Sequence, residues 1–418
     1  MVSQDNLLGE ERVDSEAGCQ VLCGNTPQCQ VYSWFLTGEC LLLSSCSVHD
    51  LTCQCWTGPR ECPVTTTVYP CHTPDSDENG AWLCHQDEEE LTCYLQCEPG
   101  YAAPAGSKAV CRQGSWSRPV FDMKCLITVA LVTGGSEWGP LQSVEIYSSN
   151  ISQYLPDLPQ DYRYHSCDFV EGEVLVCGGL SASGYCNYLT PDKDWSLHSN
   201  FTHPREGHST SIITDSLLVM GGYFSSETSE LFTPDIGNTW QQGQDLGYDH
   251  VNGCAVKIAP EVILMIGGEK SLNTVVEWNI TSGVKTRRAD LLQGRFWHSC
   301  VFFNIRESGF RGVLVAGGYT GGHNLEVDIL AHTEILDLST GIWRRVGDLN
   351  MKRDGLDLVV IEGGKILAMG GENGTTSLRS VELFQFETES WVYQRDLLMV
   401  RDWLSVTSVP LEIIKDYL

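Results

Sequence analysis

The sequence predicts a mainly β protein in which six repeated β units follow two small cysteine-rich modules. Two observations carry this prediction. An apolar run that ends in Gly-Gly occurs six times after residue 126, at spacings of 44, 43, 46, 50 and 53 residues. Fourteen of the 19 cysteines lie within residues 1–125. Self-similarity at such a period indicates a repeat architecture, and dense cysteines in a short stretch indicate a disulfide scaffold.

The Gly-Gly runs are expected to be the second strands of their units. Each is followed by a strand with an acidic residue or its substitute between apolar ones, and most units then have an aromatic such as Trp343. A strand that opens with Arg-x-x-His or a related pattern comes next. This patterning predicts four short strands per unit. The runs are ALVTGG (130–135), VLVCGG (174–179), LLVMGG (217–222), ILMIGG (263–268), VLVAGG (313–318) and ILAMGG (366–371).

Residues 126–418 resemble the kelch repeat in this order of Gly-Gly, acidic strand, aromatic residue and arginine. The resemblance implies a β-propeller. The chain enters the array on a second strand and leaves it, at 399–414, on a first strand that has no partner. We therefore expect six blades, with the C-terminal strand closing the blade that begins at residue 126, because closure removes exposed sheet edges.

Residues 1–63 resemble the apple/PAN family, an α+β module, in the stretches CQVLCGNTPQC and WTGPREC. The resemblance implies the disulfides Cys19–Cys40 and Cys23–Cys29. Four further cysteines then remain, and the sequence allows three pairings among them. These are Cys46, Cys53, Cys55 and Cys62.

Residues 64–125 resemble a sushi (complement-control) module, an all-β unit, in the stretches CEPGY and GSW and in the final cysteine. Asp75–Gly80 opens like a calcium-binding loop but lacks the glutamate at its twelfth position, so whether it binds calcium stays open. The resemblance implies the disulfides Cys71–Cys111 and Cys97–Cys125, with Cys84–Cys93 as an extra bridge.

The chain is expected to be secreted, because small disulfide modules form in oxidising compartments. The start has no apolar signal core and no run of about 18 apolar residues follows, so we expect a mature or cropped N-terminus and no direct membrane insertion. A net charge of −28 argues against nucleic acid as a partner. Four N-glycosylation sequons support secretion: Asn150, Asn200, Asn279 and Asn373.

In the array, Cys177 and Cys186 face each other across an expected hairpin and can bridge. The odd number of five cysteines leaves at least one thiol, and Cys167 and Cys300 are expected to be buried and inert on innermost strands.

Catalysis is not expected. TPDIGNTW (233–240) matches the Asp box of sialidase propellers, but this motif is a structural turn. Galactose oxidase-type copper enzymes use two histidines, two tyrosines and a cysteine, and the repeat pattern explains His208 and His298 better. We therefore predict no enzyme activity, no cofactor and no metal, with a glycan-directed propeller enzyme as a minor alternative.

A binding face is the preferred hypothesis. In a four-stranded blade the second-to-third and fourth-to-first loops emerge on one face, and aromatic residues mixed with arginine are typical of interface hot spots. The alternative is that the arginines are buried against acidic residues such as Glu145, Glu230 and Glu334. The candidates are Tyr162, Arg205, Tyr223, Tyr248, Arg295, Tyr319, His323, Arg353, Arg401 and Trp403.

The predicted function is that of a secreted recognition or adhesion glycoprotein, which binds an extracellular protein or glycan partner. The loop at 319–332 is the longest of its kind and the expected contact element. The main alternative is a structural subunit of an extracellular assembly that self-associates. These assignments depend on fold analogy, which is a weak guide to function.

Overall fold

The structure is a computed structural model. It separates into two compact units: residues 1–71, 86–91 and 111–115 form one, and the remaining residues form the other. It describes residues 7–12, 31–34, 39–43, 73–75, 77–86, 90–104, 106–112, 115–117, 123–180, 184–190, 194–213, 216–234, 239–306, 308–321 and 328–415.

The first unit contains an antiparallel three-stranded sheet, with strand order β1-β3-β2. Cys40 lies in β3, and the other cysteines predicted to pair in an apple/PAN-like domain lie outside the described residues. The domain boundaries at 63 and 125 stay predictions. The strands are β1 (Leu7–Arg12), β2 (Val31–Trp34) and β3 (Glu39–Leu43).

A second small sheet has the order β4-β5-β7-β8. Disulfides join Cys84 to Cys93 and Cys97 to Cys125. Cys111 is also disulfide-bonded, while Cys71 lies outside the described residues. The Asp77 carboxylate accepts hydrogen bonds from the backbone N–H groups of Glu78 and Cys125. The strands are β4 (Gly80–Gln86), β5 (Glu90–Cys97), β7 (Lys108–Arg112) and β8 (Ser115–Trp116), with β6 (Tyr101–Ala102) between β5 and β7.

Six antiparallel sheets follow in the described part of the array, five with four strands and the first with five, because β6 also pairs with β9 there. They confirm the prediction of a mainly β chain. We number the sheets 1 to 6. Sheet 1 combines β9 (Leu126–Thr133), β10 (Val144–Tyr147) and β11 (Ser152–Leu155) with β32 (Ser405–Pro410). Sheet 2 holds β12 (Ser166–Val170), β13 (Glu173–Cys177), β14 (Tyr185–Leu189) and β15 (Trp195–Asn200). Sheet 3 holds β16 (Ser209–Ile213), β17 (Ser216–Met220), β18 (Ser229–Phe232) and β19 (Trp240–Gln242). Sheet 4 holds β20 (Cys254–Ala259), β21 (Val262–Ile266), β22 (Val275–Asn279) and β23 (Lys285–Arg287). Sheet 5 holds β24 (Ser299–Ile305), β25 (Phe310–Ala316), β26 (Thr333–Asp337) and β27 (Ile342–Arg345). Sheet 6 holds β28 (Asp357–Ile361), β29 (Lys365–Met369), β30 (Val381–Gln385) and β31 (Ser390–Tyr393).

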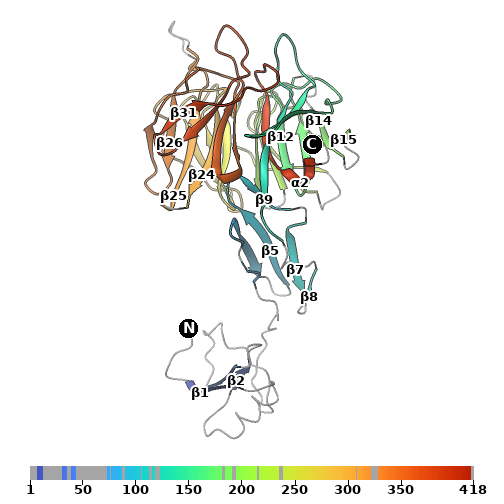
Figure 1. The fold of residues 1–418 in the computed structure, drawn as a ribbon, viewed down its shortest axis with the longest axis vertical. Coiled ribbons are helices and arrows are strands. Elements are labelled where there is room, and N and C mark those ends of the chain that lie inside the picture. The colour runs from blue at the N-terminus through green and yellow to red at the C-terminus, as the bar shows by residue number, and fades with distance from the viewer. Residues whose placement is uncertain are drawn as a thin grey trace. The chain divides into compact units, whose positions relative to one another are not determined.

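The first strands of the sheets lie next to one another in a closed ring. Contacts join β12 to β16, β16 to β20, β20 to β24 and β24 to β28. Strand β32 contacts both β12 and β28 and so closes the ring. In Figure 1 the red C-terminal strand lies beside β9 and β12. Strand β32 pairs with β9 from Ser405 opposite Thr133 to Pro410 opposite Thr128, so the two ends of the array belong to one sheet.

The second strands are buried along nearly their whole length. Each has a sheet on both sides, which explains why these strands are continuous apolar runs rather than alternating ones. In sheets 2, 3, 5 and 6 a buried tryptophan on the fourth strand ties the sheet to its predecessor. Trp240 donates to Ser199 of sheet 2, and Trp391 donates to Thr333 of sheet 5.

The Gly-Gly pairs end the second strands in a conformation that favours glycine. Gly267 and Gly268 have φ values of 62° and 117°. A Cβ atom on Gly267 would lie 2.6 Å from the Arg295 carbonyl oxygen and from the His298 ring. Close approach of the next junction therefore requires glycine here.

Two disulfides lie in the sheets. One joins Cys177 to Cys186 within sheet 2, and the other joins Cys254 on β20 to Cys300 on β24. The expectation of a free, buried Cys300 is therefore wrong. Innermost strands of neighbouring sheets lie side by side, and the Cα atoms of this pair are 6.0 Å apart, within disulfide reach. Cys167 is free and buried.

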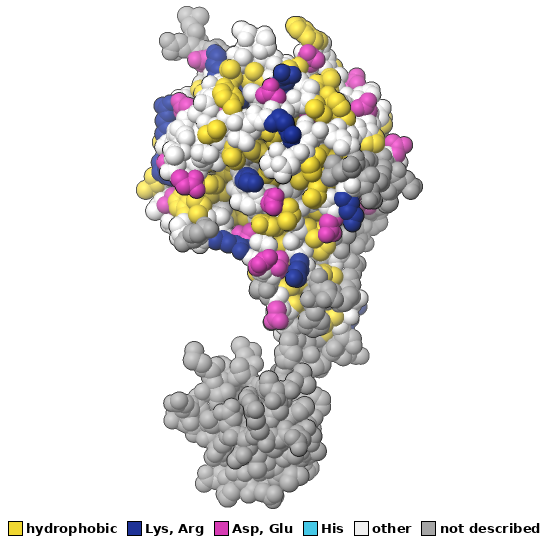
Figure 2. Space-filling model, in the orientation of Figure 1, with side chains coloured by type: hydrophobic (Ala, Val, Ile, Leu, Met, Phe, Trp, Pro, Cys, Tyr) yellow, Lys and Arg dark blue, Asp and Glu magenta, His cyan; other side chains and the backbone are white. Residues whose placement is uncertain are grey.

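In the part of the chain that the structure describes, no helix reaches the length and apolarity of a membrane-crossing helix. The short elements there are η2 (Glu362–Gly364) and α2 (Leu411–Ile414). Figure 2 shows one side of the molecule, on which acidic and basic side chains are interspersed among apolar ones.

Candidate binding rim

The junctions that lead into the six first strands meet around the opening between the sheets. One residue from each junction donates its backbone N–H to the carbonyl oxygen of the equivalent residue in the preceding junction, at 2.8–3.2 Å. The sixth bond returns to the first residue, so the ring is closed. We call these residues and their junction neighbours the rim. The ring members are Tyr164, Gly207, Asn252, Trp297, Gly355 and Trp403.

All six ring residues have positive φ, between 47° and 61°. Glycine and asparagine adopt this region readily, whereas it strains Tyr164, Trp297 and Trp403 by about 1–3 kcal/mol each. Such strain persists only where the surroundings over-determine it, and it clusters at functional sites. The ring hydrogen bonds supply that constraint here.

The four candidate arginines do not lie on the binding face. Arg205, Arg295, Arg353 and Arg401 are each 0% exposed, and the sequence prediction that placed them at a partner-binding surface is wrong. Each extends back into its own sheet and pairs with a fully buried glutamate on the third strand. The nitrogen–oxygen distances are 2.9 Å to Glu230, 2.6 Å to Glu334, 2.6 Å to Glu382 and 3.2 Å to Glu145.

Burial is the main cause that lowers the pKa of Arg295, and the pKa of Arg353 is lowered for the same reason. A guanidinium still stays charged at any physiological pH. Arg353 also donates to the carbonyl oxygens of Gly370 and Ser380 at 2.8 and 3.0 Å. The arginines therefore hold the first, second and third strands of each sheet together.

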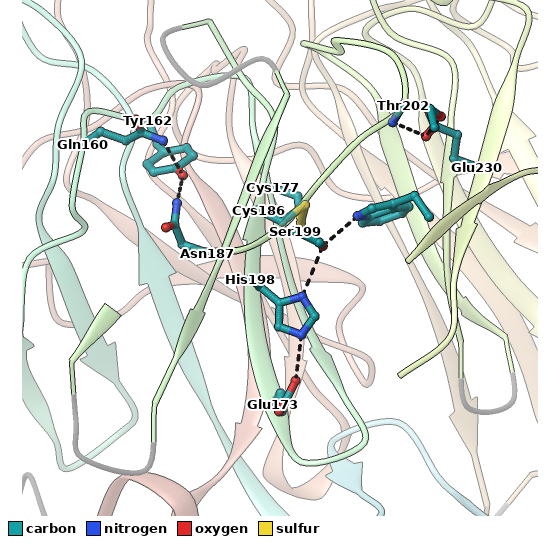
Figure 3. Close-up of a disulfide and its surroundings, with 11 residues drawn as sticks. Gln160, Tyr162, Glu173, Cys177, Cys186, Asn187, His198, Ser199, Thr202 and Glu230 are labelled. Atoms are coloured by element: carbon teal, nitrogen blue, oxygen red, sulfur yellow. Dashed lines mark hydrogen bonds and ion pairs between the residues drawn. A yellow bond between two sulfur atoms is a disulfide. The ribbon is translucent and has the colours of Figure 1, made fainter. Parts of the chain in front are cut away.

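Tyr162 occupies the arginine position of sheet 2 and is also 0% exposed, so its prediction as a binding residue is wrong. Figure 3 shows its hydroxyl between Gln160 and Asn187, and Asn187 stands where other sheets have glutamate. A neutral tyrosine–asparagine pair thus replaces the ion pair in this sheet. Burial raises the pKa of Tyr162.

The remaining candidate residues differ in their exposure. Tyr223, which is 38% exposed, and the half-buried Tyr319 and Trp403 lie at the surface of the rim. Tyr248 is partly buried and packs against the core between sheets 3 and 4. His323 lies outside the described residues.

Sequence reasoning missed Tyr164 and Trp297 as rim residues. Tyr164 follows the buried Tyr162 by two positions, and Trp297 follows the buried Arg295 by two positions. The equivalent residues in sheets 3 and 4 are Gly207 and Asn252. The six positions share a backbone conformation rather than a side-chain type, so their own residues do not mark them. Counting two residues from each Arg-x-x-His motif would have found Trp297.

Aromatic rings gather around one side of the opening. The ring centroids of Trp403 lie 4.8 Å from Tyr164 and 6.1 Å from Trp297, and Trp297 lies 5.7 Å from Tyr319. Between the ring residues lies a pocket of about 100 Å³, with His165, His208 and His298 in its lining. The pocket lining therefore combines aromatic rings with histidine and leucine side chains.

The pocket histidines are neutral. Burial, and then the charge of a nearby arginine, lowers the pKa of His165 and of His208 to about 3. His165 shares a hydrogen bond with the Thr133 hydroxyl at 2.9 Å. Neither ring nitrogen of His208 or His298 has a hydrogen-bond partner among the described residues.

We expect His208→Leu to stabilise the protein in acid. Leucine occupies the equivalent position in sheet 6, as Leu356, and in sheet 1, as Leu404. The unfolded chain binds a proton below about pH 6.5, while folded His208, with its pKa of about 3, does not. This group therefore costs stability as the pH falls from about 6.5 toward 3, by roughly 2–3 kcal/mol near pH 4.5.

Denaturant melts of both proteins from pH 7 to pH 4 check this expectation. The stability gap in favour of the variant should widen as the pH falls, and a constant gap would contradict it. The comparison between variant and parent removes the opposite trend of buried carboxyls such as Asp168, whose pKa burial raises to about 6.

The comparisons with known proteins agree with the repeat architecture. A Kelch motif matches residues 359–398. Kelch-like protein 25 of Xenopus laevis is 22% identical over 277 residues, which cover 62% of this chain and 43% of that relative. The match therefore spans less than half of the relative's length. Together they support a kelch-repeat β-propeller, while the apple/PAN and sushi assignments stay predictions.

Two solved structures are similar in fold. The structure titled "Structure of YjhT" has a TM-score of 0.51 at 14% identity, over 64% of this chain and 98% of that one. A novel fungal alcohol oxidase of the AA5 family, in complex with copper, has a TM-score of 0.46 at 19% identity, over 66% of each chain. The prediction that this chain is not an enzyme is therefore wrong, because the fold that it shares with the structure titled "Structure of YjhT" leaves enzyme activity open.

A metal-dependent activity would need side chains that converge on a metal ion. The described residues contain no group of three or more histidine, cysteine, aspartate or glutamate side chains placed to hold one. The three pocket histidines line the same space without converging on a point.

Proposed function

We propose that the six sheets are the blades of one closed propeller, and that this propeller binds a protein partner on the rim face. The observation that carries the proposal is the closed ring of six backbone hydrogen bonds, which holds Trp297 and Trp403 in strained conformations at the surface. A rigid scaffold lowers the entropy cost of binding, and tryptophan is enriched at interface hot spots.

Exposed aromatic side chains extend the rim outward. Trp138 is 97% exposed and Phe224 is 78% exposed, and both follow Gly-Gly pairs in second-to-third-strand loops. Exposed apolar side chains of this size are typical of protein interaction sites when they lie on one face. They support a partner that covers both the loops and the opening.

We further propose that the protein works in an oxidising, extracellular setting. The pairing of Cys254 with Cys300 and of Cys177 with Cys186 supports this proposal, because such bonds persist in oxidising compartments. The exposed side chains of Asn150 and Asn200 are compatible with glycan attachment.

The test first identifies the partner and then compares its binding to two matched double variants. Photo-crosslinkers placed at position 138, and in a second sample at position 154, identify proteins captured from an extracellular extract. Each captured protein is then titrated with purified chains. We expect Trp138→Ala with Phe224→Ala to weaken binding at least about tenfold. Tyr154→Ala with Tyr393→Ala removes half-exposed aromatics from fourth strands and should change it little.

Two results would overturn the proposal. Equal losses in both double variants would place the contact on the outer strands, as expected of a structural subunit. Copper-dependent oxidation of an alcohol, measured as peroxide release and lost on rim substitution, would make the rim an active site.

A further inference from the structure

The rim is acidic as well as aromatic. Three junctions place a carboxylate just before the ring residue, namely Glu206, Asp354 and Asp402. Two loops place Glu269 and Glu372 directly after Gly-Gly, where backbone bridges tie them to the junctions, as Glu372 is tied to Asp354. The face on which arginines were expected therefore carries negative charge.

Two of these carboxylates are buried and incompletely satisfied. Asp354 is 1% exposed and Asp402 is 3% exposed, and the Oδ1 atom of each has no hydrogen-bond partner among the residues that the structure describes. The other oxygen of Asp402 accepts a hydrogen bond from the Ser377 hydroxyl at 2.8 Å. Buried polar atoms are normally paired, so these two carboxylates lack part of the hydrogen bonding that buried oxygens usually have.

The groups around Asp354 and Asp402 do not supply enough positive charge. Burial, and then repulsion from Glu372 and Asp402, raises the pKa of Asp354 to about 7, although Lys352 opposes it. Burial is also the main cause that raises the pKa of Asp402 to about 6, with Glu372 adding to it and the Ser377 hydrogen bond and Arg163 opposing it. An added cation would favour the charged form of both.

The Arg163 guanidinium is a cation of the chain itself that lies on the rim. Its guanidinium lies 5.7 Å from the centroid of the Tyr164 ring and 5.9 Å from that of Trp403. Its charge also stabilises the ionised forms of Glu206 and Asp402. One side of the opening thus has its own guanidinium between aromatic faces and carboxylates.

The neighbouring part of the rim repeats the arrangement without the cation. Trp297 and Tyr319 lie near one another, and Asp354 and Glu372 form the adjacent junction. Among the described residues no lysine or arginine lies over the Trp297 ring. At the base of the pocket, neutral His208 and His298 each offer one nitrogen lone pair to an N–H donor.

We propose that the rim binds a basic segment of its protein partner, and that a lysine or arginine side chain of that segment enters the pocket between Trp297 and Trp403. This inference depends on the protein-binding function proposed above and names the chemistry of the partner. Cation–π contact with the tryptophan rings would hold the side chain, and the rim carboxylates beside the pocket would attract its positive charge. The overall charge of −28 would speed the approach of a basic partner.

The experiment uses defined probes and the whole chain. An oligo-arginine peptide, an oligo-lysine peptide and an oligo-glutamate peptide of equal length are titrated at physiological salt. We expect both basic peptides to bind, and Asp354→Asn with Asp402→Asn to lower their affinity at least about tenfold. The control is Glu362→Gln with Glu412→Gln, which removes the same charge from exposed positions in η2 and α2 and should have little effect.

A second variant tests the aromatic contribution without disturbing the ring. Asparagine already occupies the ring position at 252 with a φ of 53°, so Trp297→Asn with Trp403→Asn keeps a compatible backbone. We expect the affinity for oligo-arginine to fall about fivefold. Affinity for both basic peptides should also fall as the pH drops from about 8 to 5, because Asp354 and Asp402 take up protons near pH 7 and 6.

Three results would overturn the inference. Equal losses in the rim and control charge variants would mean attraction to net charge alone. Tighter binding of oligo-glutamate than of the basic peptides would mean that the site selects negative charge. Absence of binding by either basic peptide would reject a basic ligand, and if the captured partner were still lost on Trp138→Ala with Phe224→Ala, the proposed protein-binding function would stand without it.

Discussion

Replacing Arg353 by alanine is expected to destabilise the propeller by about 3–5 kcal/mol, because it leaves a buried charge without its partner. Glu382 is 0% exposed, and its Oε1 atom lies 2.6 Å from the Arg353 guanidinium. The substitution also removes the donors to the Gly370 and Ser380 carbonyl oxygens. The midpoint of urea unfolding at pH 7 measures the loss.

The chain offers its own control for this substitution. Arg353→Tyr with Glu382→Asn copies the Tyr162–Asn187 pair of sheet 2, which fills the same positions without charge. We expect this double variant to be more stable than Arg353→Ala. A single variant as stable as the parent would contradict the structural role. If the role holds, alanine scanning of these arginines reports folding rather than binding.

Removing the disulfide between Cys254 and Cys300 is expected to have the second large effect. The bond joins sheets 4 and 5 and closes 46 residues of chain. The chain-entropy estimate for a loop of that length is about 4 kcal/mol. Cys254→Ala with Cys300→Ala should therefore lower the melting temperature, measured without reductant.

The disulfide within sheet 2 is the matched comparison. Cys177 and Cys186 are only 9 residues apart, which predicts a smaller stabilisation of about 2.6 kcal/mol. We expect Cys177→Ala with Cys186→Ala to lower the melting temperature less. Reductant should lower the melting temperature of the six sheets in the parent, and leave that transition almost unchanged in a chain without either of these two disulfides. A larger effect from the shorter loop would contradict the entropic explanation.

The repeated strands could be predicted because their signal is local. ILMIGG at 263–268 predicts a buried strand that ends in a tight turn, and β21 with Gly267 and Gly268 has that structure. Burial on both faces demands a continuous apolar run, and the close approach of the next junction demands glycine. Both demands act within six residues, so the sequence displays them.

Whether the arginine side chains point into the sheets or toward solvent could not be predicted in the same way. Arginine is usually exposed, and the Arg-x-x-His pattern fits a surface ring as well as a buried one. Arg295 is buried because Glu334, 39 residues later, lies opposite it within the same sheet. The pairing of Cys254 with Cys300 likewise depends on which first strands become neighbours.

The sequence by itself therefore determined the mainly β class, the repeat period and the strands that form the core of each sheet. Only the tertiary structure decided which residues form the rim. Tyr164, Gly207, Asn252, Trp297, Gly355 and Trp403 share no side-chain type, and they become one ring only when the sheets meet. The physical reason is that strand patterns follow from local burial, whereas the rim forms from single residues that the closed arrangement brings together.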